Sequence, residues 1–145
     1  MNTPKNENTD SPFGAVIYSY TRAQAIADGV QVEVTKTAQE AGISIPVFLT
    51  RTVWDAYVTL PPNGQCGSHQ DEAGRLWDIV WMLRFAIIRV RSHRSGSAPC
   101  NRCPVALYVR NDNRAAKLVK LIAQCGPLDM DDPAPAITVM LPGED

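Results

Sequence analysis

The stretch that decides the fold reads DEAGRLWDIVWMLRFAIIRV and covers residues 71–90. Its apolar residues recur every three or four positions, the period of one face of an α-helix, at Leu76, Val80, Leu83, Ile87 and Val90. Four further large apolar residues widen this stripe: Trp77, Trp81, Phe85 and Ile88. The acidic residues that begin the stretch suit the positive end of a helix. We therefore predict a long helix that is apolar on most sides and lies buried at the centre of the core.

Short elements are predicted before this helix. Residues 16–20 are mostly apolar or aromatic and predict a first strand. Thr21 and Gln24 form a capping-box pattern that begins a short helix, which Gly29 ends in the left-handed conformation. Valines alternate with polar residues over residues 30–34 and predict a half-buried strand.

Two more short helices and an extended segment follow. Thr35 or Thr37 can cap a helix that runs to residue 41 and stops at Gly42. Residues 43–49 contain Pro46, which predicts an extended piece that lies at a sheet edge if it is a strand at all. Thr50 is the predicted cap of a third helix.

The chain ends in strands. Residues 105–110 and 136–141 predict strands, while 117–124 fit either a helix or a strand, of which we favour the strand. Residues 126–133 predict a long turn. The order lacks the regular alternation of a doubly wound sheet. We predict an α+β fold: a flexible tail over residues 1–14, then one domain over 15–145, with the long central helix packed on a mainly antiparallel sheet that ends in a C-terminal β-meander.

Composition fits one folded domain. The chain has 145 residues, of which 45% are hydrophobic and 20% are charged, and this excludes a wholly disordered protein. The formal net charge is −1, so binding to nucleic acid or to acidic lipid needs a local patch. No apolar run is long enough for a membrane span, and the polar N-terminus does not resemble a secretory signal. We expect a cytoplasmic protein without a membrane partner.

Cysteines and one histidine form a candidate metal site. Cys66 and His69 are separated by two residues, and so are Cys100 and Cys103. This gap lets a turn present two ligands to one tetrahedral zinc ion, and three thiolates with one imidazole are a permitted set. The predicted helix lies between the two pairs, so the loops must meet in space. Loop cysteines without metal are the alternative, which we favour, and no cofactor other than zinc is expected.

Basic residues gather at the end of the predicted helix and in the loop after it. No acidic residue occurs from Phe85 to Arg110, and the arginines of the candidate patch lie in this region or directly before it: Arg84, Arg89, Arg91, Arg94 and Arg102. Such a patch can contact phosphates of a nucleic acid or an acidic protein surface. Cations also favour a helix C-terminus for purely structural reasons, which is the simpler interpretation.

A possible pocket combines aromatic and charged residues from two segments. Three lie near the first helix, namely Tyr18, Tyr20 and Arg22. Three lie on the long helix, namely Asp71, Arg75 and Asp78. If the two groups lie close together in the fold, they would line a functional site. The alternative is that each group lies at the edge of the hydrophobic core with its hydrogen bonds satisfied.

Four segments carry a resemblance to a known family. They are IYSYTRAQAIADGV (17–30), LTRTVW (49–54), DEAGRLWDIVWMLR (71–84) and LPGED (141–145). The chain resembles a family of small uncharacterised proteins carried by bacterial plasmids, integrative elements and phages, and the likeness covers most of residues 16–145. The resemblance implies an accessory protein of a mobile element inside a bacterial cell, and it implies no catalytic residues.

Enzyme motifs do not occur in the sequence. There is no phosphate-binding glycine loop and no nucleophile elbow, and the two histidines, His69 and His93, fall in predicted loops. Our leading hypothesis is a non-enzymatic interaction protein that binds a bacterial or mobile-element protein and counteracts host defence. The alternatives are a nucleic-acid-binding protein that uses the arginines and an enzyme with a pocket near Tyr18, Tyr20 and Arg22.

Overall fold

The computed structural model describes residues 20–61, 71–92, 101–111 and 115–144. Most of the predicted first strand and the whole predicted tail lie outside these residues. The elements in chain order are α2 (Arg22–Ala27), β1 (Gln31–Glu33), α3 (Thr35–Glu40), β2 (Val47–Thr50), α4 (Arg51–Val53), the π-helix η1 (Trp54–Val58), α5 (Glu72–Ser92), β3 (Arg102–Val109), β4 (Lys117–Asp129) and β5 (Asp132–Met140).

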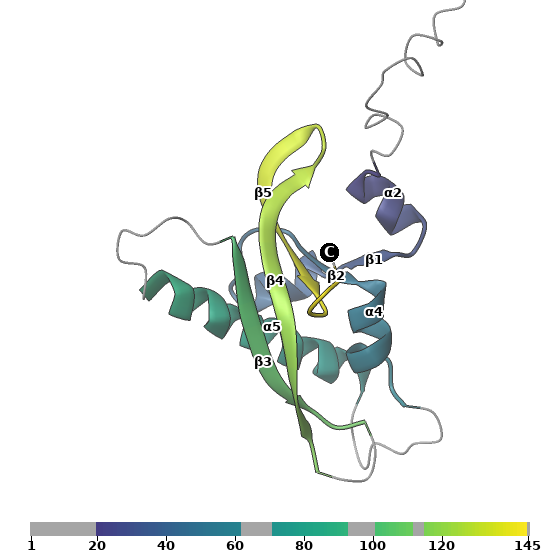
Figure 1. Ribbon diagram of the computed structural model, residues 1–145, viewed down its shortest axis with the longest axis vertical. Coiled ribbons are helices and arrows are strands. Elements are labelled where there is room, and N and C mark those ends of the chain that lie inside the picture. Colours follow the sequence, from purple (N-terminus) through teal and green to yellow (C-terminus); the bar gives the residue numbers. More distant parts are fainter. Residues whose placement is uncertain (1–19, 62–70, 93–100, 112–114, 145) are drawn as a thin grey trace, which may run out of the picture.

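The strands form one five-stranded sheet in the order β1-β2-β5-β4-β3. The last three strands form an antiparallel meander, and β1 and β2 are also antiparallel. Only the β2–β5 pair among these is parallel. The fold is therefore α+β with a mainly antiparallel sheet and a C-terminal meander, as predicted, and residues 117–124 are a strand (Figure 1).

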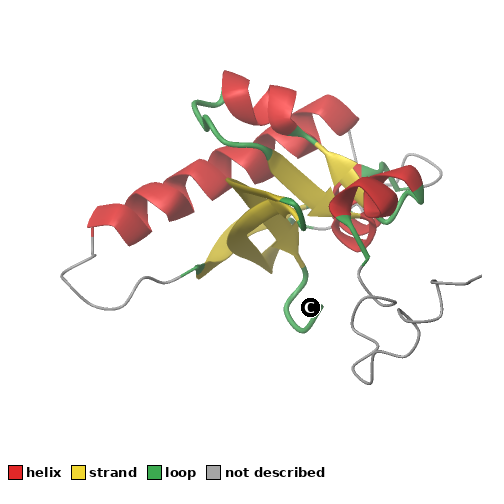
Figure 2. Cartoon of the chain, turned by 90° about the horizontal axis from the view of Figure 1, so that it is seen from above, coloured by secondary structure: helices red, strands yellow, loops and turns green. Residues whose placement is uncertain are grey.

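Helix α5 covers one face of this sheet, and the C-terminus lies on the other side (Figure 2). Side chains on a strand alternate between the two faces, so every second residue of β3 and β4 points at the helix. Val105 and Leu121 do so, and both are fully buried together with Ile79, Val80 and Leu83 of α5. This layer between α5 and the sheet is the main hydrophobic core.

The prediction that α5 is buried on most sides is wrong. Trp77 and Trp81 are each 36% exposed, Ile88 is 43% exposed and Phe85 is 45% exposed. Successive residues turn by about 100° around a helix, so these four project away from the face that carries Ile79 and Leu83. A helix that packs on one face of a sheet buries only the side turned towards that sheet, and the opposite side of α5 is also apolar.

The prediction of an edge position for residues 43–49 is also wrong. Strand β2 pairs with β1 on one side and β5 on the other, and Val47, Phe48 and Leu49 are all buried. Pro46 lies just before the strand, where its missing N–H is not needed. Its carbonyl oxygen instead accepts a hydrogen bond from the backbone of Ile137 at 2.9 Å.

The predicted turn over residues 126–133 is shorter than expected. Strand β4 continues to Asp129 and β5 begins at Asp132, so only two residues join them. Pro127 faces Pro135 across the pair, and the register shifts between Pro127 and Asp129. This bulge lets a proline-containing segment remain in the sheet. The strands extend beyond the core as a hairpin arm (Figure 1).

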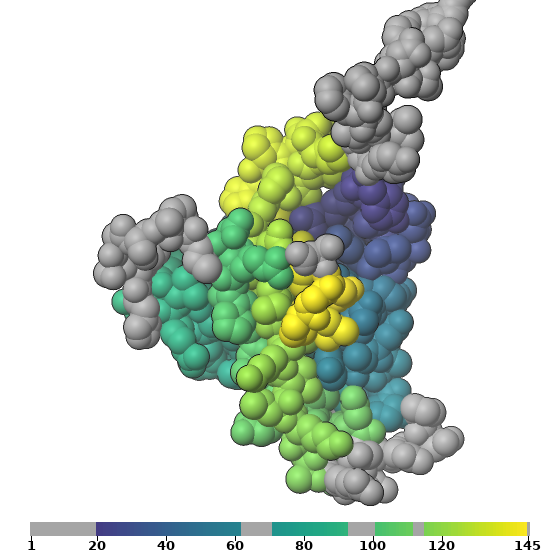
Figure 3. Space-filling view, viewed as in Figure 1, coloured from purple at the N-terminus to yellow at the C-terminus, as the bar shows by residue number. Residues whose placement is uncertain are grey.

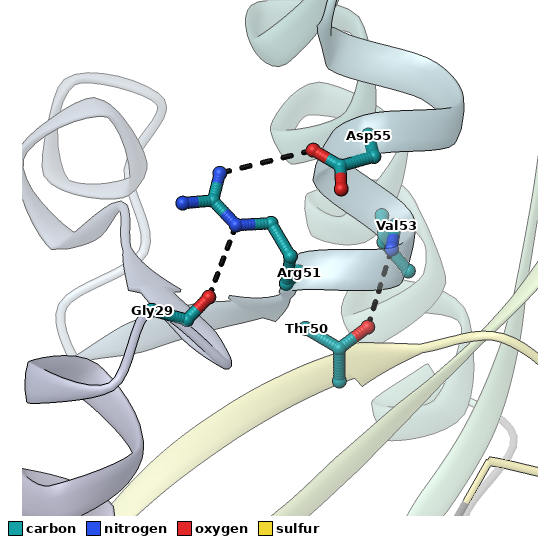
Figure 4. A network of polar contacts seen from close by, with 5 residues as sticks. All are labelled: Gly29, Thr50, Arg51, Val53 and Asp55. Atoms are coloured by element: carbon teal, nitrogen blue, oxygen red, sulfur yellow. Dashed lines mark hydrogen bonds and ion pairs between the residues drawn. The ribbon is translucent and has the colours of Figure 1, made fainter.

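Two of the three predicted helix caps are present. Thr21 caps α2 with the full capping box, and Gly29 follows that helix with a φ of 78°. The Thr50 hydroxyl accepts a hydrogen bond from the backbone N–H of Val53 at 3.3 Å. The Arg51 side chain donates to the carbonyl oxygen of Gly29 at 3.0 Å and forms an ion pair with Asp55 at 3.8 Å (Figure 4). Helix α3 differs from the prediction, because its N-cap is Val34 and not Thr35 or Thr37, and Val34 makes no capping hydrogen bond with its side chain.

Candidate functional site

Arg22 fastens the first helix to the sheet face opposite α5. Its guanidinium lies over the ring of Phe48, 4.2 Å from the ring centroid, and donates to the Thr138 hydroxyl at 2.9 Å. It also donates to the Gln31 side chain and to the carbonyl oxygens of residues 127 and 128. Phe48 and Thr138 do not belong to the cluster of core residues around α5, because alternation along the strands places them on the second face.

Asp129 completes this attachment from the hairpin arm. Its carboxylate accepts from the backbone N–H groups of Arg22 at 2.9 Å and Ala23 at 3.0 Å, at the exposed start of α2. In the space-filling view, the N-terminal helix and the β4–β5 hairpin lie side by side (Figure 3). Hydrogen bonds from the backbone of Met130, Arg22 and Ala23 lower the pKa of Asp129. Burial lowers the pKa of Arg22, and the negative charge of Asp129 opposes that shift.

Tyr20 lies at the outer end of the same region. Its hydroxyl donates to a carboxylate oxygen of Asp28 at 2.6 Å, and this hydrogen bond raises the pKa of Tyr20. The side chain is more than half exposed. Tyr18 lies outside the described residues.

A separate cavity, which we call the Arg75 cleft, lies at the N-terminal end of α5. Its volume is about 530 Å³, and its lining includes Tyr57, Asp71, Arg75, Asp78, Tyr108 and Arg110. Arg75 is only 6% exposed. It donates to the carbonyl oxygens of Tyr57 and Arg110, both at 2.9 Å, and to the side chain of Asn111. Burial raises the pKa of Asp78, and the positive charge of Arg75 partly offsets that rise.

The described members of the predicted six-residue pocket do not form one site. Tyr20 and Arg22 lie with α2, whereas Asp71, Arg75 and Asp78 line the Arg75 cleft. The reason is that α2 packs on the sheet face that α5 leaves open. The guanidinium groups of Arg22 and Arg75 each bind backbone oxygens and side chains of neighbouring segments, so these contacts are structural.

Three of the five predicted patch arginines meet at a second cavity. We call it the arginine-rimmed pocket, and its rim is formed by Arg84 and Arg91 of α5 and Arg102 of β3. Its volume is about 390 Å³. Arg89 is exposed on α5 outside this lining, and Arg94 lies outside the described residues. The loop after α3 forms the facing wall.

The predicted zinc set cannot be placed, because Cys66, His69 and Cys100 lie outside the described residues. Cys103 is half-buried on β3 and lines the arginine-rimmed pocket together with Cys125. No group of three or more histidine, cysteine or acidic residues gathers within residues 20–61, 71–92, 101–111 and 115–144. The zinc site stays a prediction.

The outer face of α5 carries the feature that the sequence interpretation missed. Trp77 and Trp81 stack with their ring centroids 5.6 Å apart, and Phe85 meets Trp81 edge-on at 5.7 Å. The guanidinium of Arg84 lies over Trp81, 5.2 Å from the ring centroid. We call Trp77, Trp81, Phe85 and Ile88 the aromatic face. Its spacing of four, four and three residues is visible in the sequence, but that spacing also fits a core stripe.

Comparison with known proteins places the chain in a family. The model of the family of unknown function DUF6573 matches residues 11–145. The chain belongs to this family. No curated protein and no solved structure matches it. Within the described residues of this DUF6573 member, no helix has both the length and the apolar character needed to cross a membrane.

Segments of this DUF6573 chain that are far apart in sequence meet in the fold. Arg22, from the first of the four segments quoted above, binds the β4–β5 hairpin. Thr50, from the second, donates its hydroxyl proton to the Glu144 carboxylate of the C-terminal LPGED segment at 3.0 Å. The same carboxylate accepts from the backbone of Leu141 at 2.8 Å, where Gly143 has a φ of 86°. These hydrogen bonds join the two ends of the domain to the sheet.

Proposed function

We propose that this chain is a non-enzymatic interaction protein that binds another protein through the aromatic face of α5. The observation that carries the proposal is the contiguous surface ladder of Trp77, Trp81 and Phe85, extended by Ile88. Contiguous exposed apolar patches mark interaction surfaces on soluble proteins. Tryptophan and other aromatic residues are enriched at the energetic centres of protein interfaces.

The aromatic side chains of the ladder contact one another in the free chain. Each ring already contacts the next one along the helix, and Arg84 lies over Trp81. Aromatic side chains have few rotatable bonds, and contacts at spacing i to i+4 restrict them further. Little side-chain entropy is then lost on binding, which favours tight association for a modest area.

Charge indicates the chemistry of the partner. Arg84 lies over Trp81, Arg89 and Arg91 follow in the last turn of the same helix, and no acidic residue follows in the sequence until after Arg110. We infer a protein surface that presents apolar side chains bordered by aspartate and glutamate. Complementary charge of this kind raises association rates and excludes basic partners. The alternative of nucleic acid is less well supported, because Trp81 already carries Trp77 and Arg84 against its ring.

The family resemblance suggests a setting for this partner. The resemblance described in the sequence analysis implies an accessory protein of a bacterial mobile element, and from it we infer that the partner is a protein of the bacterial host or of the element. A host defence protein with an acidic, apolar surface is the candidate class that we propose.

Photo-crosslinking tests the proposal while the identity of the partner is still open. A benzoyl-phenylalanine residue is placed at Phe85 or, as a control, at Tyr108, which is exposed on β3. The proteins are irradiated in cells that naturally express the chain, and crosslinked proteins are identified by mass spectrometry. We expect one partner that crosslinks from position 85 and not from 108, with acidic residues around its crosslinked site.

Affinity measurements on the purified partner complete the test. The double change Trp81→Ala with Phe85→Ala is expected to weaken binding at least about a hundredfold, the loss of two interface anchors. Arg89→Glu should weaken it by slowing association, and Tyr108→Ala should leave it unchanged. Unchanged affinity in the double variant contradicts the proposal. So does a concentration-dependent homodimer that the double variant abolishes, because a second copy then covers the face.

A further inference from the structure

The arginine-rimmed pocket adjoins the aromatic face at Ile88, which lines it, but the rest of its lining comes from other residues. Its floor is apolar and comes from three elements, with Ile87 of α5, Ala123 of β4 and Ile137 of β5. Ile43 and Ile45 supply the wall from the loop after α3. A volume of about 390 Å³ lies in the range of small-molecule sites, which extends from about 300 to 1,000 Å³.

The charge at the mouth of this pocket has one sign. Arg84, Arg91 and Arg102 converge from two elements that are adjacent only in the fold, and no acidic residue lines the cavity among the residues that the structure describes. Guanidinium groups present a planar fork of donors that matches carboxylate and phosphate oxygens. An apolar chamber beneath such a rim matches a molecule with an apolar body and one anionic head.

The position of Arg84 is set by its surroundings. The aromatic ring of Trp81 lies beneath its guanidinium on one helix turn. Gly42 lies on the opposite wall with a φ of 95°, and a Cβ added there would be 3.2 Å from Nε of Arg84. The loop after α3 therefore approaches the arginine as closely as it does because it has no side chain at this point. A half-buried arginine held in this way loses less freedom when it binds an anion.

We propose that the arginine-rimmed pocket is a binding site for a small amphiphilic organic anion, with its carboxylate or phosphate at Arg84, Arg91 and Arg102 and its apolar body against Ile87 and Ile137. This function is additional to protein binding by the aromatic face. Ile88 and Arg84 belong to the lining of this pocket and also lie at the aromatic face, whereas Phe85 does not line the pocket. Phe85→Ala therefore tests protein binding without removing a residue of the pocket.

Titration with defined probes tests the site on the full chain. Octanoate and octyl phosphate are added to isotopically labelled protein, and backbone amide resonances are followed by NMR. Both are expected to shift the amides of residues 42–45 and 101–103 in a saturable way. Two controls vary only the head group, and neutral 1-octanol and cationic octylammonium should bind at least about tenfold more weakly, the loss of a charge-assisted contact.

Variants identify the groups responsible. The double change Arg84→Gln with Arg91→Gln should weaken both anionic probes by at least about tenfold, with the circular dichroism spectrum unchanged. Lys120→Gln removes an exposed cation from β4 outside the pocket and should have no effect. Phe85→Ala should also leave probe binding unchanged, even though it weakens the proposed protein partner.

Three results would overturn the proposal: no saturable shift with either anion, equal binding of 1-octanol, or shifts confined to amides outside the pocket. If both anions bind in the pocket, their relative affinities show whether the site prefers a carboxylate or a phosphate ester as the head group.

Discussion

Nε of Arg75 donates a hydrogen bond to the carbonyl oxygen of Tyr57 at 2.9 Å, although eighteen residues separate them in the chain. The same guanidinium reaches the carbonyl oxygen of Arg110, thirty-five residues further on. One buried side chain on α5 thus satisfies backbone acceptors at the end of η1 and at the end of β3. Arg75 lies in the cleft because its side chain connects α5, η1 and the end of β3 through hydrogen bonds.

Replacement of Arg75 should lower the free energy of unfolding. Arg75→Met should keep most of the apolar stem but leave the Tyr57 and Arg110 carbonyls without their donor, and a loss of about 3 kcal/mol in the free energy of unfolding is expected. Urea unfolding measures it. Arg91→Met on the same helix is the control, because Arg91 is exposed and should change stability by no more than about 0.5 kcal/mol. Equal effects of the two substitutions would refute the assignment.

Asp129 should make stability depend on acid pH. Its folded-state pKa is lowered by three backbone N–H donors, so the folded state favours the carboxylate more than the unfolded chain does. The resulting stabilisation is complete above the unfolded pKa of about 3.9 and is lost as the pH falls below that value through the lower folded pKa.

Asp129→Asn should therefore unfold more easily than the natural chain at pH 7, and the difference should shrink as the pH falls towards 3. Urea unfolding over a series of pH values checks this. Asp131→Asn is the matched control, since Asp131 lies exposed in the turn next to the same strand. A stability difference for Asp129→Asn that is constant across the pH range would rule out the linkage.

Two glycines should respond oppositely to alanine. Gly42 has a φ of 95°, where an L side chain is strained, and its added Cβ would press on Arg84. Gly42→Ala should destabilise the protein by about 1–2 kcal/mol. Gly126 lies in β4 with open space where a Cβ would be, so Gly126→Ala should be neutral or stabilising by about 0.5 kcal/mol. Thermal unfolding of both variants decides the matter, and equal losses would contradict it.

One-sided burial of α5 is testable with two residues two positions apart. Leu83 is fully buried, and Leu83→Ala should cost about 3 kcal/mol. Phe85 is the larger side chain but lies on the aromatic face, and Phe85→Ala should cost less than about 1 kcal/mol. A loss for Phe85→Ala as large as that for Leu83→Ala would mean that the aromatic face is covered within the chain.

Local patterns in the sequence were sufficient for much of the fold. The three-to-four spacing of residues 71–90 identified α5, and the Thr21 and Gln24 pair identified the start of α2. The C-terminal strands lie where apolar segments between turns predicted them, although residues 117–124 also fitted a helix. Each of these signals lies within one segment. The arginine patch was also visible, but the distances among its members were not.

The errors came from contacts between segments. Pro46 suggested an edge strand, yet β5 places β2 inside the sheet. Arg22 and Arg75 were grouped as charged residues of two segments that could line one pocket, yet Arg22 binds the sheet face opposite α5 and Arg75 lies on α5. The aromatic face appeared to be core, because a periodic apolar pattern does not specify which face a neighbour covers.

The sequence by itself determined which segments become helices and strands, because backbone preference and side-chain period act over a few neighbouring residues. Only the tertiary structure decided that α5 buries Leu83 and exposes Phe85, and that Arg84, Arg91 and Arg102 share one rim. The physical reason is that burial and convergence depend on how α5 packs against β3 and the rest of the sheet, and these contacts join residues that are distant along the chain.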